Sequence, residues 1–129
     1  MFKEEIKVEN APKSMSGISP QAIKVGNFVF LTAQSAIDPI TGKIVGDDIR
    51  EQTKQTFLNI DNILKGAGGS LKNLVKLTVY LSSFEDYSAF NEVYKEMVPQ
   101  PYPARSCIPQ ELFPGTLVEI EAIAYLEER

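Results

Sequence analysis

The sequence predicts a single α+β domain, a sandwich in which two helices cover one face of a mixed β-sheet. Several short segments alternate apolar and polar residues with the two-residue period of a strand, and two longer segments repeat apolar residues with the period of a helix. The predicted order is β-β-β-α-β-α-β-β, and two strand–helix–strand units within it pack on one sheet. A chain of 129 residues has the length of one such domain, residues 1–129.

Three strands are expected in the first quarter of the chain. Residues 2–8 alternate apolar and charged side chains, as an edge strand does. Residues 22–25 and 28–33 flank Gly26 and Asn27, a pair that favours a tight hairpin because both residues accept positive φ. The segment 28–33 is largely apolar, which is typical of a strand covered on both faces.

The first helix is expected to begin after Asp47 or Asp48, since either can cap the free N–H groups of the first turn. Its apolar stripe recurs with helical spacing, and three glycines within residues 66–69 end it, because glycine adopts the left-handed C-cap conformation.

Residues 75–81 alternate as a strand, and a second amphipathic helix follows over residues 84–97. Two adjacent serines before this helix have capping-box spacing to acids in its first turn, and three prolines after it stop it. Residues 105–108 and 116–126 supply the final strands.

The composition excludes several classes of function. The chain has no histidine, which removes Ser-His-Asp and Cys-His catalysis and the usual zinc sites. A net charge of −4 with scattered basic residues argues against nucleic acid. No apolar run is long enough to span a membrane, the N-terminal segment lacks the apolar stretch of a signal peptide, and the single cysteine fits a reducing compartment. We therefore expect a cytoplasmic protein.

The two faces of the final strand differ. One face is wholly apolar and suits a core covered by helices. The other face carries two acids among apolar residues, which makes it too apolar for free solvent and too acidic for a dry core. An interface between subunits that contains a polar cleft fits both conditions. The residues of this second face are Leu117, Glu119, Glu121, Ile123 and Tyr125.

Arg105 is the first candidate for a binding residue. It follows a run of prolines on a short extended segment, and an arginine binds a carboxylate or phosphate through a planar fork of donors. A nearby acid, Glu119 or Glu121, could steer or deprotonate a water molecule. These residues predict a site for a small anionic metabolite. An ordinary surface arginine or a structural salt bridge is the alternative, and the sequence does not separate the two glutamates.

Residues 102–107 (YPARSC) and 118–122 (VEIEA) resemble the C-terminal signature of the RidA (YjgF) family of small trimeric proteins. The resemblance extends from residue 9 to residue 124. It implies a chorismate-mutase-like fold and a homotrimer with sites between neighbouring subunits. It also implies hydrolysis of 2-iminobutanoate or 2-iminopropanoate to 2-keto acids and ammonia, without a metal or organic cofactor. Other matching stretches are residues 38–42, 52–68, 75–81 and 91–94.

The resemblance also implies roles for individual residues. The arginine that matches Arg105 holds the substrate carboxylate, and the glutamate that matches Glu119 holds the hydrolytic water. Cys107 lies two residues after Arg105 and would form a wall of the pocket or donate its backbone N–H, or else be a small buried apolar residue. Asn91 matches a helix asparagine near the cleft, and a solvated helix residue is the alternative. Glu121 is then structural.

The sequence departs from the family at two places. The family has S-G-Q where this chain has Thr32, Ala33 and Gln34. The methyl group of Ala33 is expected to narrow the pocket, although the backbone N–H of Ala33 can still donate to the ligand. Ser19 stands where deaminases of the family have a tyrosine that lines the site, and serine cannot fill that volume. Two alternatives therefore stay open: a trimer that binds 2-keto acids without turnover, and an endoribonuclease or translation inhibitor, a role attributed to some relatives.

Overall fold

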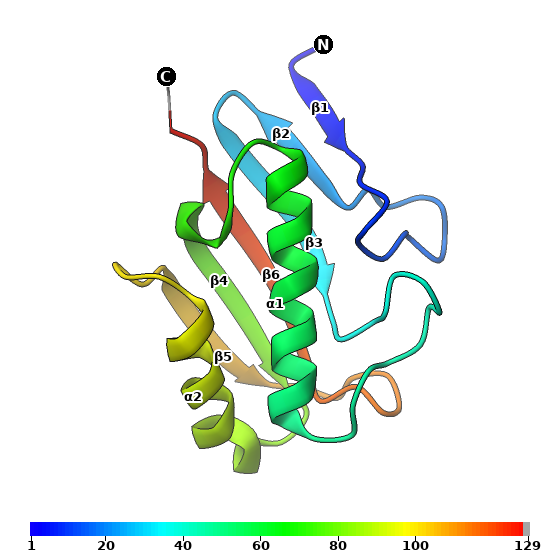
Figure 1. The fold of residues 1–129 in the computed structure, drawn as a ribbon, viewed down its shortest axis with the longest axis vertical. Helices are drawn as coiled ribbons and strands as arrows, with labels where there is room; N and C mark the ends of the chain where they lie inside the picture. The colour runs from blue at the N-terminus through cyan, green and yellow to red at the C-terminus, as the bar shows by residue number, and fades with distance from the viewer. Residues whose placement is uncertain (128–129) are drawn as a thin grey trace.

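The computed structural model describes residues 1–127, which form a six-stranded sheet with both α-helices on one face (Figure 1). The strand order is β1-β2-β3-β6-β4-β5, and every neighbouring pair is antiparallel except β4 and β5, which are parallel. The predicted α+β class, mixed sheet and placement of the helices are therefore confirmed. The strands are β1 (Lys3–Ile6), β2 (Ala22–Val25), β3 (Phe28–Gln34), β4 (Leu74–Leu81), β5 (Ala104–Pro109) and β6 (Val118–Tyr125).

The core lies between the sheet and the two helices, α1 (Ile49–Gly66) and α2 (Tyr87–Met97). The apolar stripe of α1 is fully buried against β3, β6 and α2. Phe57 of α1 lies 6.4 Å from Phe90 and 6.0 Å from Tyr94 of α2, measured between ring centroids. These aromatic contacts hold α2 against α1 and so fix the helix that stands over the edge strand β5.

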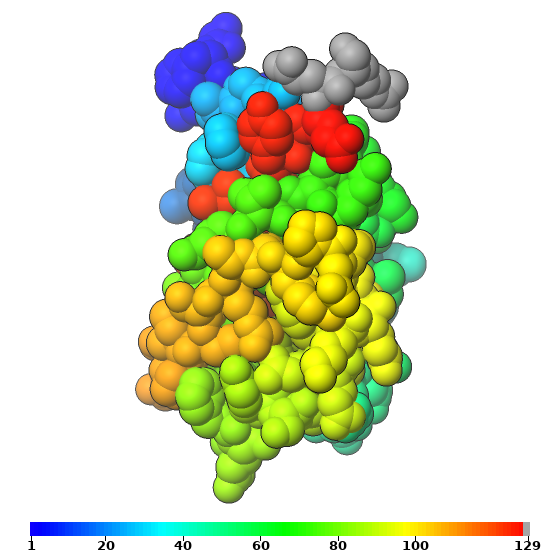
Figure 2. Space-filling model, turned by 90° about the vertical axis from the view of Figure 1, so that its left-hand side faces the viewer, coloured from blue at the N-terminus to red at the C-terminus, as the bar shows by residue number. Residues whose placement is uncertain are grey.

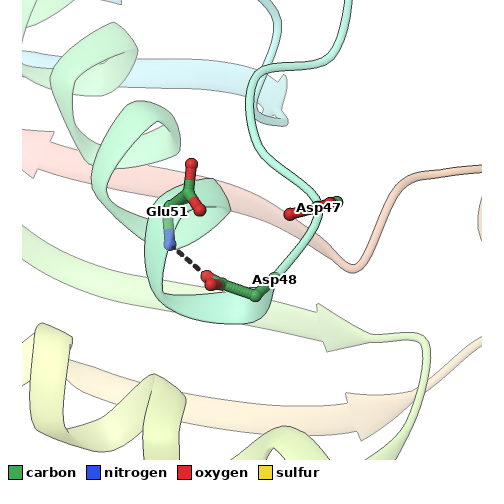
Figure 3. Close-up of side chains that lie close together, drawn as sticks. All are labelled: Asp47, Asp48 and Glu51. Atoms are coloured by element: carbon green, nitrogen blue, oxygen red, sulfur yellow. Dashed lines mark hydrogen bonds between the residues drawn. The ribbon is translucent and has the colours of Figure 1, made fainter.

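Asp48 is the N-cap of α1. Its carboxylate accepts a hydrogen bond from the backbone N–H of Glu51 at 2.9 Å (Figure 3), which decides between the two aspartates that the sequence offered. Asp47, Asp48 and Glu51 lie close together and exposed at this helix start. Acids are favoured there because the helix dipole is positive at its N-terminus, and we assign the group to helix capping.

Replacing Asp48 by alanine is expected to lower the free energy of unfolding by about 1 kcal/mol, because one helix N–H loses its partner. Urea denaturation monitored by circular dichroism measures this change. Asp47→Ala is the matched control, since Asp47 is an exposed neighbouring acid that does not cap the helix. An equal loss in both variants would show that general charge, rather than the cap, stabilises this end.

The second helix begins one turn later than the sequence predicted. Ser83, rather than Ser82, accepts a hydrogen bond from the backbone N–H of Glu85 at 3.2 Å and caps a short 3-10 helix, Phe84–Asp86, before α2 begins. The first and last strands of the chain, β1 and β6, are also shorter than the alternating segments from which they were predicted. In each case the period of the side chains continues beyond the last backbone hydrogen bond of the element.

Buried amide side chains hold the loops onto this framework. Gln21 donates to the carbonyls of Val8, Ala11 and Pro12 at 3.0–3.1 Å and so fastens the loop between β1 and β2. Gln52 of α1 accepts from the backbone N–H of Leu117 at 2.9 Å and fastens the segment before β6 in the same way. These two loops flank the start of β6, where Glu119 lies.

The face of the sheet opposite the helices is not covered by residues 1–127. Phe28 and Phe30 of β3 are 43% and 44% exposed, so the prediction of a strand covered on both faces is wrong within one chain. Alternation with the buried Val29 and Leu31 shows that only one face of β3 packs against the core. We call this side the open face; its residues include Phe28, Phe30, Tyr80, Glu119, Glu121, Ile123 and Tyr125.

Candidate functional site

Arg105 lies on the edge strand β5 and faces α2. Its parallel register places it beside Leu77, a fully buried residue of β4, so both side chains lie on the helix-covered side of the sheet. Arg105 Nη2 donates to Asn91 Oδ1 at 2.7 Å and to Tyr87 Oη at 3.4 Å. The guanidinium carbon also lies 4.6 Å from the centroid of the Tyr94 ring, a distance at which cation and ring attract each other.

The positive charge of Arg105 is not neutralised within the described part of the chain. Arg105 Nη1 is buried and has no hydrogen-bond partner among residues 1–127, and no carboxylate there forms an ion pair with the guanidinium. A buried donor without a partner is destabilising, and more so when it carries charge. The arrangement is therefore suited to an anion that supplies the missing acceptor.

A cavity of about 330 Å³ lies beside this guanidinium. It opens where α2 meets β5, and Figure 2 looks onto this side of the molecule, with α2 in yellow-green to yellow beside β5 in orange. Its lining residues are Asn91, Tyr94, Lys95, Tyr102, Pro103 and Arg105.

Cys107 lies on the same side of β5 as Arg105 and packs against the core. Burial raises the pKa of the Cys107 thiol, and the Arg105 charge offsets part of that shift. Since the thiolate is the nucleophilic form, a raised pKa favours the prediction that Cys107 forms a wall of the site rather than a nucleophile.

Glu119 lies on the open face, at the start of β6. A second cavity, of about 380 Å³, brings it together with Ser19, Thr32 and Ala33. The Thr32 hydroxyl donates to the carbonyl of Pro20 at 2.7 Å, which holds the loop that carries Ser19 against β3. Ser19 is exposed, and it leaves open the space that a larger side chain would fill.

The pKa of the Glu119 carboxyl is raised from its ordinary value, first by burial and then by the charge of Glu121. Glu121 accepts a hydrogen bond from Tyr80 Oη at 3.2 Å on the same face. Because the folded-state pKa of Glu119 is raised, its contribution to stability is complete below the ordinary pKa of 4.5 and is lost as the pH rises through the folded value.

Replacing Glu121 by glutamine is expected to lower the pKa of Glu119, because a like charge that opposes ionisation is removed. The pKa should stay above the ordinary value, since burial is the larger cause. A carboxyl carbon NMR titration measures the shift. Tyr80→Phe is the control, because it removes the hydrogen bond to Glu121 but keeps the Glu121 charge. A Glu119 pKa that is unchanged in Glu121→Gln, or that falls only in Tyr80→Phe, would contradict this explanation.

The predicted site residues form two groups on opposite faces of the sheet. The register explains the separation, because Glu119 pairs with Tyr80 on the open side while Arg105 pairs with Leu77 on the covered side. The expectation that Arg105 and the acids adjoin is therefore not met within one chain. We call Arg105, Cys107 and Asn91 the arginine group, and Glu119, Ser19, Thr32 and Ala33 the acid group.

The sequence did not identify several residues around Arg105 as part of a site, among them Tyr87, to which the guanidinium donates. Tyr94 carries the apolar period of the second helix, and neither Lys95 nor Tyr102 belongs to a pattern that points to a site, yet all three line the cavity beside Arg105. The signal was present in the spacing, since Tyr94 and Lys95 follow Asn91 by three and four residues and so share its side of the helix.

Comparisons with known proteins show the family. Residues 8–126 match the profile of the family described as Endoribonuclease L-PSP. A RutC family protein of Pyrococcus abyssi is 50% identical over 128 residues, which cover 98% of this chain and 100% of that protein. A Bos taurus protein named 2-iminobutanoate/2-iminopropanoate deaminase is 38% identical over 121 residues, which cover 92% of this chain and 88% of that protein.

The fold agrees with the same family. The crystal structure of RidA from an Antarctic Psychrobacter species superposes with a TM-score of 0.90 at 38% identity, over 95% of this chain and 99% of that one. The chain therefore belongs to the endoribonuclease L-PSP family, which is the YjgF/RidA family that its sequence resembles.

Two expectations about the cell and the assembly stay predictions. Within residues 1–127, no helix combines the length and the apolar character that a membrane span requires. Other relatives are named mitochondrial or chloroplastic, so the cytoplasmic location is not decided by the family. The homotrimer likewise stays a prediction.

Proposed function

We propose that this protein hydrolyses reactive 2-imino acids of the 2-iminobutanoate and 2-iminopropanoate type to 2-keto acids and ammonia. The observation that carries the proposal is Arg105 Nη1, a buried and unpartnered N–H of a cation beside a cavity, which is suited to a substrate carboxylate. The deaminase names of relatives that are 38% identical agree with it.

The proposed active unit is a homotrimer in which each site lies between two subunits. The arginine group and the acid group lie on opposite faces of one chain, so a single chain cannot present both to one small substrate. A neighbouring subunit that covers the open face would bring its acid group to the arginine group of the next subunit. The open face carries the exposed aromatic residues Phe28, Phe30 and Tyr125, and an exposed apolar patch of this kind favours burial against a neighbouring subunit.

The chemistry then needs binding, orientation and proton transfer. The Arg105 guanidinium holds the substrate carboxylate. The imine nitrogen is protonated, and this makes the imine carbon electrophilic toward a water molecule beside Glu119. The water oxygen bonds to this carbon, and its proton passes through the Glu119 carboxyl to the substrate nitrogen. The carbon–nitrogen bond then breaks and ammonia leaves, while the second proton of the water passes to the Glu119 carboxylate as the water oxygen becomes the keto oxygen. A carboxyl with a raised pKa is better matched to accept and return this proton.

The test is an imine hydrolysis assay with the full chain. A pyridoxal-phosphate dehydratase acting on threonine supplies 2-iminobutanoate, and semicarbazide traps whatever imine remains. We expect the protein to reduce the trapped imine in proportion to its concentration. No reduction at any protein concentration would contradict the proposed activity.

A second candidate function is binding of 2-keto acids without turnover. The exposed Ser19 favours it, because the cavity beside Glu119 stays wide where deaminases of the family carry a tyrosine. Calorimetry that shows Arg105-dependent binding of 2-oxobutanoate, together with a negative imine assay, would select this function. An endoribonuclease, as in the name of the family, is less favoured because the net charge of −4 repels a polyanion.

A further inference from the structure

We propose that the cavity beside Arg105 binds a second anionic group through Lys95, so that the protein prefers 2-imino or 2-keto acids whose side chain ends in a carboxylate. This inference rests on the proposed function, because it assigns the α-carboxylate of the substrate to Arg105. It names the class of side chain that the same site accepts.

The charge of the cavity lining is the first reason. The cavity is lined by two cations, Arg105 and Lys95, and by no acid among residues 1–127. Lys95 is exposed on the last turn of α2 and forms no ion pair with a described residue, whereas Lys13, Arg50 and Lys65 each have an acid within 3.2 Å. A cavity with two unpaired cations is complementary to a ligand with two anionic ends.

The size of the cavity is the second reason. Its volume of about 330 Å³ corresponds to on the order of ten water molecules at liquid density. That space exceeds what the ethyl group of 2-iminobutanoate needs, and it extends from Arg105 along the last turn of the helix to Lys95. A side chain of two methylene groups that ends in a carboxylate would use it.

Tyr94 supplies the third reason. Its side chain is only 5% exposed, it lines the cavity, and its hydroxyl has no hydrogen-bond partner among residues 1–127. Burial raises the pKa of this hydroxyl, which stays protonated and able to donate to an anion. The ring of Tyr102 lies 5.5 Å from that of Tyr94, between centroids, and gives the cavity an apolar wall for the methylene groups.

The experiment is calorimetric titration of the full chain with three ligands: 2-oxoglutarate, 2-oxobutanoate and 2-oxohexanoate. The last has an uncharged side chain of similar length, so it separates charge from size. We expect 2-oxoglutarate to bind roughly two- to fivefold more tightly than either other ligand, as one additional exposed ion pair implies. Lys95→Met should abolish this preference, and Lys95→Arg should retain it.

Lys54→Met is the matched control, since Lys54 is an exposed helix lysine on α1 that does not line the cavity. It changes the net charge by the same amount and should leave the preference intact. Equal binding of the three ligands, a preference for 2-oxohexanoate, a preference that survives Lys95→Met, or no binding of any ligand would overturn the inference. A preference for 2-oxoglutarate without imine hydrolysis would uphold it and reject the proposed catalysis instead.

Discussion

Replacing Arg105 by alanine is expected to lower kcat/KM for 2-iminobutanoate by roughly 30-fold to several thousand-fold, which corresponds to about 2–5 kcal/mol of lost transition-state stabilisation. The reason is the geometry of the guanidinium. Nη2 donates to Asn91 and Tyr87, while Nη1 is buried and has no partner among residues 1–127. The variant removes the only proposed ligand of the substrate carboxylate.

Two further variants sharpen this prediction. Arg105→Lys should restore part of the activity, since an ammonium keeps the charge but not the planar fork. Arg50→Ala is the matched control, because Arg50 is an exposed arginine of α1 whose partner is Glu92 at 3.0 Å, outside both cavities. Wild-type kinetics in Arg105→Ala, or an equal loss in Arg50→Ala, would reject the role given to Arg105.

Glu119→Gln is expected to lower kcat by about 10²–10⁴ with a smaller change in KM, because the amide keeps the size of the side chain but cannot accept and return a proton. Steady-state kinetics of imine hydrolysis separates the two parameters. The raised pKa and partial burial of Glu119 distinguish it from an ordinary surface acid.

Glu121→Gln is the control for this prediction, since Glu121 lies two residues along the same strand and is exposed. It should change kcat only a few-fold, through its effect on the pKa of Glu119. The pair therefore decides which glutamate acts on water, a choice that the sequence left open. A larger loss of kcat in Glu121→Gln than in Glu119→Gln would exchange the two roles.

The fold was predictable because its signals are local. The alternation of β4 and β6 and the apolar stripe of α1 each depend on the period of one element, and the structure confirms them. Where two neighbouring residues offered the same cap, at Asp47 and Asp48, the sequence could not choose, because the choice depends on the backbone path before the helix. The late start of α2 could not be predicted either. A 3-10 turn can precede an α-helix without changing the residue pattern, and here the 3-10 helix Phe84–Asp86 occupies the start of the predicted segment.

The candidate site was predictable only in its residues, not in its arrangement. Whether Arg105 faces the helices or the open side depends on the register of β5 on β4, a pairing between segments far apart in the chain. The same register places Arg105 and Glu119 on opposite faces, and no local pattern contains that information. Lys95 could not be identified from the sequence for a related reason. An exposed lysine on a helix is common, and only the cavity between α2 and β5 shows that Lys95 lies beside Arg105.

The most direct test mixes two inactive variants. Arg105→Ala and Glu119→Gln subunits are denatured together in equal amounts and refolded. If Arg105 of one subunit and Glu119 of the next form one site, every mixed trimer contains one intact site, so the mixture should recover about a quarter of the wild-type activity, while each variant refolded alone stays inactive. Recovery of no activity from mixed trimers that sedimentation shows to have assembled would contradict a site shared between subunits.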